Sequence, residues 1–164
     1  MSPDSPDLPP LDDVADLGSW SRFQPSLATF LDRCRGQGEY LTLLLTTPSP
    51  VATSDSLSQP RGLRALLRRR PAPVASHEVP GVVLTVRTDG VEVALPVLDA
   101  VGAVLLPPQA VEDLEALGWR RHTDLLVRLL PDGASAADAV ARVLIEVLDV
   151  AHPADLDHLL TRLG

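Results

Sequence analysis

The stretch that decides the fold is Val82–Trp119, with the sequence VVLTVRTDGVEVALPVLDAVGAVLLPPQAVEDLEALGW. Residues 82–87 and 91–95 form the clearest hairpin that the sequence predicts, joined through Thr88-Asp89-Gly90. Asp89-Gly90 lies between them, and this pair favours a tight hairpin turn because it tolerates positive φ. The stretch therefore predicts a strand pair, and it contains no converging polar residues that could carry out catalysis.

A helix is predicted to follow the hairpin from Pro108, because proline suits the first turn of a helix. Val111, Leu114 and Leu117 are expected to face inward. Gly118 is placed as the C-terminal stop, since glycine tolerates the left-handed conformation that ends many helices.

Upstream of the hairpin, apolar residues at helical spacing predict one further helix with a single apolar stripe. Pro25 leaves two alternatives: the helix begins after Ser19 and kinks, or it begins at Pro25 itself. Residues 40–46 then alternate, so a strand is expected, with Leu41, Leu43 and Leu45 on one face and Thr42 and Leu44 on the other. The stripe consists of Trp20, Phe23, Leu27, Phe30, Leu31 and Cys34.

Downstream, residues 124–130 are nearly all apolar and predict another strand. Ser135 and Asp138 resemble a capping box at the start of a helix that buries its alanine and valine face. A last amphipathic helix is predicted from Pro153, because leucines recur there between charged residues. Its expected inward positions are Leu156, Leu159, Leu160 and Leu163.

These elements predict an α+β fold: an antiparallel sheet of about four to five strands with helices packed on one face. Residues 1–18 are rich in proline and aspartate and are expected to be a disordered acidic leader. Residues 19–164 are expected to form a single domain, with a proline-rich insertion at 47–80.

Composition narrows the possible partners. The chain has 164 residues and a net charge of −8, which argues against nucleic acid or an anionic membrane as the main partner. The single cysteine, Cys34, excludes an internal disulfide. No basic and apolar signal segment opens the sequence, and no apolar run approaches the roughly 20 residues that span a bilayer. A cytoplasmic location without membrane contact is expected.

The sequence provides no convincing catalytic or metal-binding set. His152, Asp155 and His158 have an H-x-x-D-x-x-H spacing that a divalent metal could use, but a solvated polar helix face explains it more simply. His122 lacks a second group for acid–base work. Cys34 lies on an apolar stripe, which indicates a buried small hydrophobe. We predict no enzyme activity, no catalytic residue, no cofactor and no metal.

Two features are candidates for partner binding. A cluster of arginines inside the insertion departs from the acidic background, so it is either a docking site for an acidic partner or a solvated segment. It contains no aromatic residues for base stacking, which disfavours nucleic acid. The leucine face of the last segment either caps the core or stays open to a partner. The residues concerned are Arg61, Arg64, Arg68, Arg69, Arg70, Leu156, Leu159, Leu160 and Leu163.

Put in order, these pieces resemble the TY-Chap family, the type III secretion and YbjN-like chaperones common in actinobacteria. The similarity covers about residues 19–160, and the insertion at 47–80 departs from the family pattern. The matching residues are Trp20, Phe23, Gly38, Tyr40-Leu41-Thr42-Leu43, Asp89-Gly90-Val91-Glu92-Val93-Ala94, Leu98, Leu114-Glu115-Ala116-Leu117-Gly118-Trp119, Ala139, Val143, Leu148-Asp149-Val150 and His152-Pro153-Ala154-Asp155-Leu156.

The resemblance implies a small, acidic, non-enzymatic protein, often a homodimer, that binds a polypeptide client. The alternative from a different class is a small-ligand sensor or regulatory domain in which the insertion acts as a lid.

Overall fold

The computed structural model describes residues 11–57 and 73–163. Its elements are α1 (Leu11–Val14), α2 (Trp20–Gly36), β1 (Leu41–Thr46), β2 (Gly81–Arg87), β3 (Gly90–Pro96), α3 (Pro108–Ala116), β4 (Arg120–His122), β5 (Leu125–Leu130), α4 (Gly133–Arg142), a π-helical turn (Val143–Val147), a 3-10 turn (Pro153–Asp155) and β6 (Asp157–Arg162).

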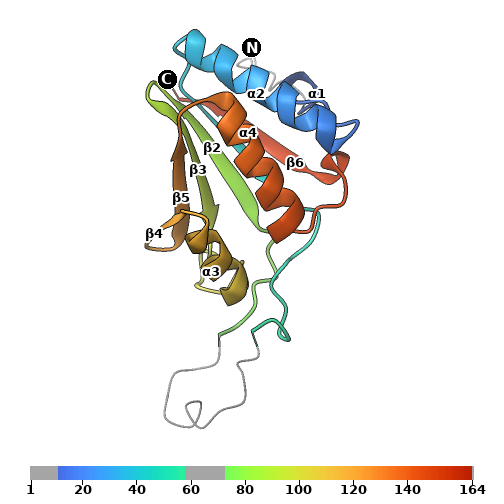
Figure 1. Cartoon of the computed structure of the whole chain (residues 1–164). Helices are drawn as coiled ribbons and strands as arrows, with labels where there is room; N and C mark the ends of the chain where they lie inside the picture. The colour runs from blue at the N-terminus through green and yellow to red at the C-terminus, as the bar shows by residue number, and fades with distance from the viewer. Residues whose placement is uncertain (1–10, 58–72, 164) are drawn as a thin grey trace, which may run out of the picture.

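The strands form one antiparallel sheet of six strands in the order β4-β5-β3-β2-β1-β6. Helices α2 and α4 lie side by side across one face of this sheet (Figure 1). The predicted α+β class with helices on one face is confirmed, although the sheet has more strands than the expected four to five.

The hairpin β2–β3 forms the centre of the sheet. Leu84 lies opposite Val93, and on its other side opposite Leu43 of β1. All three side chains point toward the helices and are fully buried. Gly90 closes the hairpin with a φ of +152°, and a Cβ there would collide with the Leu130 carbonyl of β5. Glycine is required at this turn for both reasons.

Helix α2 begins at Trp20, directly after Ser19, and runs through Pro25, so the alternative that it begins at Pro25 is wrong. Its stripe is buried at Phe23, Leu27 and Leu31. Trp20 lies at the rim of the core, where its indole N–H donates to the Ala151 carbonyl at 3.1 Å. The apolar periodicity therefore predicted the helix and its buried face correctly.

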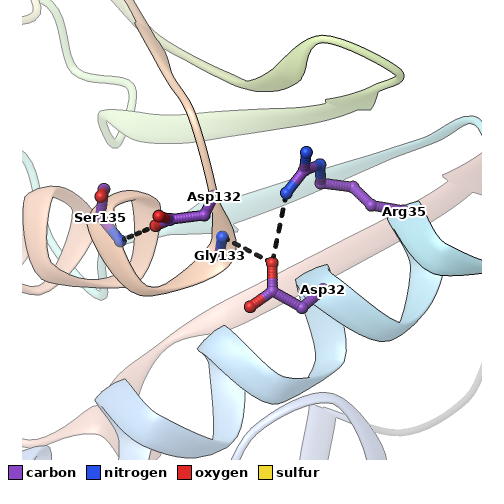
Figure 2. Close-up of polar contacts among 5 residues, drawn as sticks. All are labelled: Asp32, Arg35, Asp132, Gly133 and Ser135. Atoms are coloured by element: carbon purple, nitrogen blue, oxygen red, sulfur yellow. Dashed lines mark hydrogen bonds and ion pairs between the residues drawn. The ribbon is translucent and has the colours of Figure 1, made fainter.

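Helices α2 and α4 meet through a short polar contact (Figure 2). The Asp32 carboxylate accepts a hydrogen bond from the Gly133 N–H at 2.8 Å and lies 3.4 Å from the Arg35 guanidinium. Asp132 caps α4 by accepting from the Ser135 N–H at 2.8 Å, and this backbone hydrogen bond lowers the Asp132 pKa. The predicted capping box of Ser135 and Asp138 is wrong, because Asp132 takes the capping position.

The last predicted helix is also wrong. After the 3-10 turn the chain extends as β6 and pairs with β1, which places Leu159 opposite Leu44 and Leu160 opposite Leu43. Leucines spaced for one face of a helix therefore alternate across a strand. Leu160 is buried at 3% exposure, whereas Leu159 is 49% exposed.

The structure also differs from the prediction in two smaller respects near β4, at the other edge of the sheet. The strand β4 was not predicted; its three residues are all exposed and carry no apolar alternation. Leu117 does not face inward, since α3 ends at Ala116 and Leu117 is 57% exposed. Gly118 turns the chain with a φ of +94°, and Trp119 is the side chain that reaches the core.

The folded chain also begins before Trp20, where order was expected to start. Within the expected leader, residues 11–18 are described, and Val14 and Ala15 are buried against the core. Of the insertion, 47–57 and 73–80 are described. Leu57 is buried there, and Ala75 pairs with Val104 in an isolated bridge.

Candidate functional site

The sheet has a second face on which no helix of the described residues packs, and we call it the open face. Because side chains alternate along a strand, every second residue of each strand points to it. None of these side chains is fully buried. The open face is therefore a regular surface that this part of the chain offers to a partner.

An apolar row crosses the open face from one side of the sheet to the other. The pairing register places its members directly opposite one another on five successive strands. At its far end Arg120 of β4 pairs with the β5 member. The row consists of Val127, Ala94, Val83, Leu44 and Leu159.

Polar side chains flank this apolar row. Thr85, Thr42 and Thr161 follow one another in the next row, and Thr46 lies opposite Asp157 on the other side. Threonine hydroxyls can donate and accept hydrogen bonds. An extended peptide laid along the row would thus meet apolar contacts beneath it and hydrogen-bonding groups beside it.

At the β4 side the open face is hollowed into a cleft of about 720 Å³. Its apolar lining comes from β5 and its cationic lining from β4 and the end of β5. The lining residues are Glu92, Gly118, Arg120, Arg121, His122, Leu125, Val127, Arg128 and Leu129.

Of the predicted partner-binding leucines, the structure brings only Leu159 to the open face. Leu156 and Leu160 are buried and support the core, while Leu163 is half-exposed just beyond β6. The five predicted arginines, Arg61 to Arg70, lie outside the described residues. Whether either group binds a partner stays a prediction.

The other polar candidates lie apart. His152 Nδ1 accepts from the Ala154 N–H at 3.1 Å and so caps the 3-10 turn, while His158 lies in β6. The helix face that His158 and Asp155 were expected to share does not exist. In the described ranges, no group of three or more His, Cys, Asp or Glu side chains is arranged to hold a metal ion.

Cys34 and Asp99 contribute to packing and to loop structure: Cys34 is buried, and the Asp99 carboxylate is hydrogen-bonded within a loop. Cys34 is buried on α2 as predicted, and burial raises the pKa of its thiol. The Asp99 carboxylate accepts from the Ser76 hydroxyl at 2.5 Å and from the backbone N–H groups of Val101 and Ala103. These hydrogen bonds, that of Ser76 first, lower the Asp99 pKa. They hold the connector after β3 to the end of the insertion.

Sequence reasoning did not identify the open face as a site. The alternation in residues 40–46 already placed Thr42 and Leu44 on the face opposite to Leu41, Leu43 and Leu45. The strand order, however, joins Val83 to Val127 through β3, and nothing local in the sequence gives that order.

The comparisons with known proteins identify the family of the chain. The model of a family described as T3SS (YopN, CesT) and YbjN peptide-binding chaperone 3, TY-Chap3, matches residues 13–160. No curated protein and no solved structure matches the chain. Within the described residues, no helix has both the length and the apolar character needed to cross a membrane. The chain therefore belongs to the TY-Chap3 family of peptide-binding chaperone domains.

Proposed function

We propose that this chain is a non-enzymatic, chaperone-like module that holds an extended polypeptide segment against the open face of its sheet. The apolar row that crosses five strands carries the proposal. It is the most continuous apolar path on that face, and it does not contribute to the core beneath the helices. The family's description as peptide-binding chaperones supports the same role.

The size of the row defines the bound segment. Adjacent strands lie about 4.8 Å apart, so the path from β6 to β5 is roughly 19 Å long and continues to roughly 24 Å at β4. An extended chain advances about 3.3 Å per residue, which gives a segment of about seven residues. Alternate side chains of that segment would pack on the row, and the others would face solvent.

We test the proposal with an array of decapeptides probed with the labelled, intact protein. Leu159→Arg and Leu44→Thr interrupt the apolar row at two strands, and both are expected to reduce binding at least fivefold across the bound peptides. Threonine is chosen at position 44 because it suits a strand. Val101→Arg adds the same charge as Leu159→Arg at a connector position that is 89% exposed and off the sheet.

The control is expected to bind like the unchanged protein, and the melting temperature of each variant reports whether the fold is kept. Folded Leu159→Arg and Leu44→Thr proteins that bind the same peptides equally well would exclude the open face as the client site.

We also propose that the protein acts as a homodimer in the cytoplasm. A groove of about 240 Å³ lies between α3 and the π-helical turn. Its lining includes apolar side chains such as Leu117, Trp119 and Val147, together with the charged residues Arg128, Asp138, Arg142 and Glu146. Leu117 projects from it into solvent, which a second copy could cover. The chain's buried free cysteine is compatible with a reducing compartment.

A further inference from the structure

The cleft at the β4 side of the open face differs in charge from the rest of the molecule. The whole chain carries a net charge of −8, whereas the cleft is lined by three arginines, one histidine and a single carboxylate. Of these arginines, Arg120 has the register of the open face, because it lies opposite Val127. Arg121 and Arg128 lie opposite Leu126 and Val93, so they belong to the face that carries the helices. This positive site differs from the acidic character of the rest of the chain. The fold does not require its charges, because the β4 side chains are all exposed and do not pack in the core.

The single carboxylate of the cleft is already paired. Glu92 lies 3.1 Å from the Arg87 guanidinium on the neighbouring strand. Arg121 donates from its Nε to the Thr123 carbonyl at 3.3 Å, which is not an ion pair. In the ranges that the structure describes, Arg120 has no ion-pair partner closer than 4 Å. On the open face, the cleft therefore retains the uncompensated positive charge of Arg120.

Arg120 is also placed where a bound segment would end. It lies opposite Val127, the β5 member of the apolar row, and on the same face of the sheet. At the opposite edge, Asp157 lies on the open face beside Leu159. The apolar row thus has a cationic side at β4 and an acidic side at β6, so the two ends of the row are electrostatically different.

We infer that the cleft selects client segments in which an acidic residue follows a run of apolar side chains, with Arg120 binding the client carboxylate and Val127 and Leu125 contacting the apolar residues. The inference rests on the proposed function and specifies the client. A guanidinium can bind a carboxylate through two parallel hydrogen bonds, which gives direction as well as affinity. The bound segment is thereby oriented with its acidic end over β4.

Three synthetic peptides test this inference. Each is a fluorescein-labelled nonapeptide of alternating leucine and threonine that ends in two glutamates, two glutamines or two lysines. Fluorescence anisotropy with the intact protein is expected to show the glutamate peptide binding about fivefold tighter than the glutamine peptide, as for a partly exposed charge pair. The lysine peptide is expected to bind most weakly. The difference between glutamate and glutamine should shrink at 0.5 M salt, because exposed charges are screened.

Variants separate Arg120 from general charge. Arg120→Gln is expected to remove the preference for glutamate, and Arg120→Glu to favour the lysine peptide. Arg162→Gln is the matched control, since it removes the same charge from the edge strand on the other side of the sheet. It is expected to leave the preference unchanged.

The outcomes also separate this inference from the proposed function. Equal binding of the three peptides, weakened in each case by Leu44→Thr, would overturn the acidic preference and leave the open face as the client site. A glutamate preference that survives in folded Arg120→Gln would overturn the role of Arg120. Failure of all three peptides to bind, while the array yields bound decapeptides, would also overturn the inference.

Discussion

Single residues set how closely the helix layer packs. Gly133 begins α4 in contact with α2, and a Cβ there would collide with the Ala28 carbonyl and come within 2.9 Å of the Asp32 carboxylate. The first of these neighbours is backbone, which cannot rotate away. The contact shown in Figure 2 thus requires glycine for its space, while the backbone N–H of the same residue donates to Asp32.

Gly133→Ala is therefore expected to lower the free energy of unfolding by about 2–3 kcal/mol, as overpacking against backbone does. Urea denaturation followed by circular dichroism measures the loss. Gly36→Ala is the control, because nothing lies within 4 Å of its Cβ position at the end of α2. Alanine there should be neutral or slightly stabilising. Similar losses for the two variants would contradict the close-contact argument.

At the scale of elements, β6 is a segment whose sequence also suits a helix but which forms a strand. Its outer side has no partner strand in the part of the chain that the structure describes, while its inner side pairs with all of β1. Pairing to β1 buries Leu160 and leaves Leu159 on the open face. A helix over the same residues would have turned both leucines toward the core.

This difference gives a direct test of the strand. Leu160→Ala is expected to cost about 2–4 kcal/mol, because it removes a buried side chain. Leu159→Ala is expected to cost less than about 1 kcal/mol, since its side chain is already half-exposed. Chemical denaturation of both variants provides the comparison, and equal losses would mean that the segment does not alternate as a strand.

The elements also show what local sequence can predict. The hairpin β2–β3, α2 and α3 have strong periodicity and clear turn residues, so their positions followed from the sequence. For β6 the leucine spacing fits both a helix and a strand, and the pairing with β1 stabilises the strand. For β4 there is no periodicity at all. The open face could not be predicted, because its row joins Leu44, Val83 and Val127 through the order of strands.

On the scale of the whole molecule, the open face and the groove beside α3 lie on opposite sides of the sheet. A second copy seated on the groove would leave both open faces free. Leu117 is the side chain most available to that contact, because α3 ends just before it and it is 57% exposed.

We therefore expect light scattering after size-exclusion chromatography to give twice the chain mass of 17.5 kDa. Leu117→Glu is expected to shift the protein toward the single-chain mass, because it introduces a charge into an apolar contact. Val101→Arg should not change the mass. A single-chain mass for the unchanged protein at tens of micromolar would rule out the homodimer.

The alternation along the strands has a further consequence for how this domain can vary. Each strand carries two interleaved sets of residues: one set, such as Leu43 and Leu84, fills the interior, and the other, such as Leu44 and Val83, faces outward. Substitutions in the outward set leave interior volume unchanged. The recognition surface can therefore diversify by mutation while the scaffold stays constant, so two proteins with this fold could accept different clients without any difference in architecture.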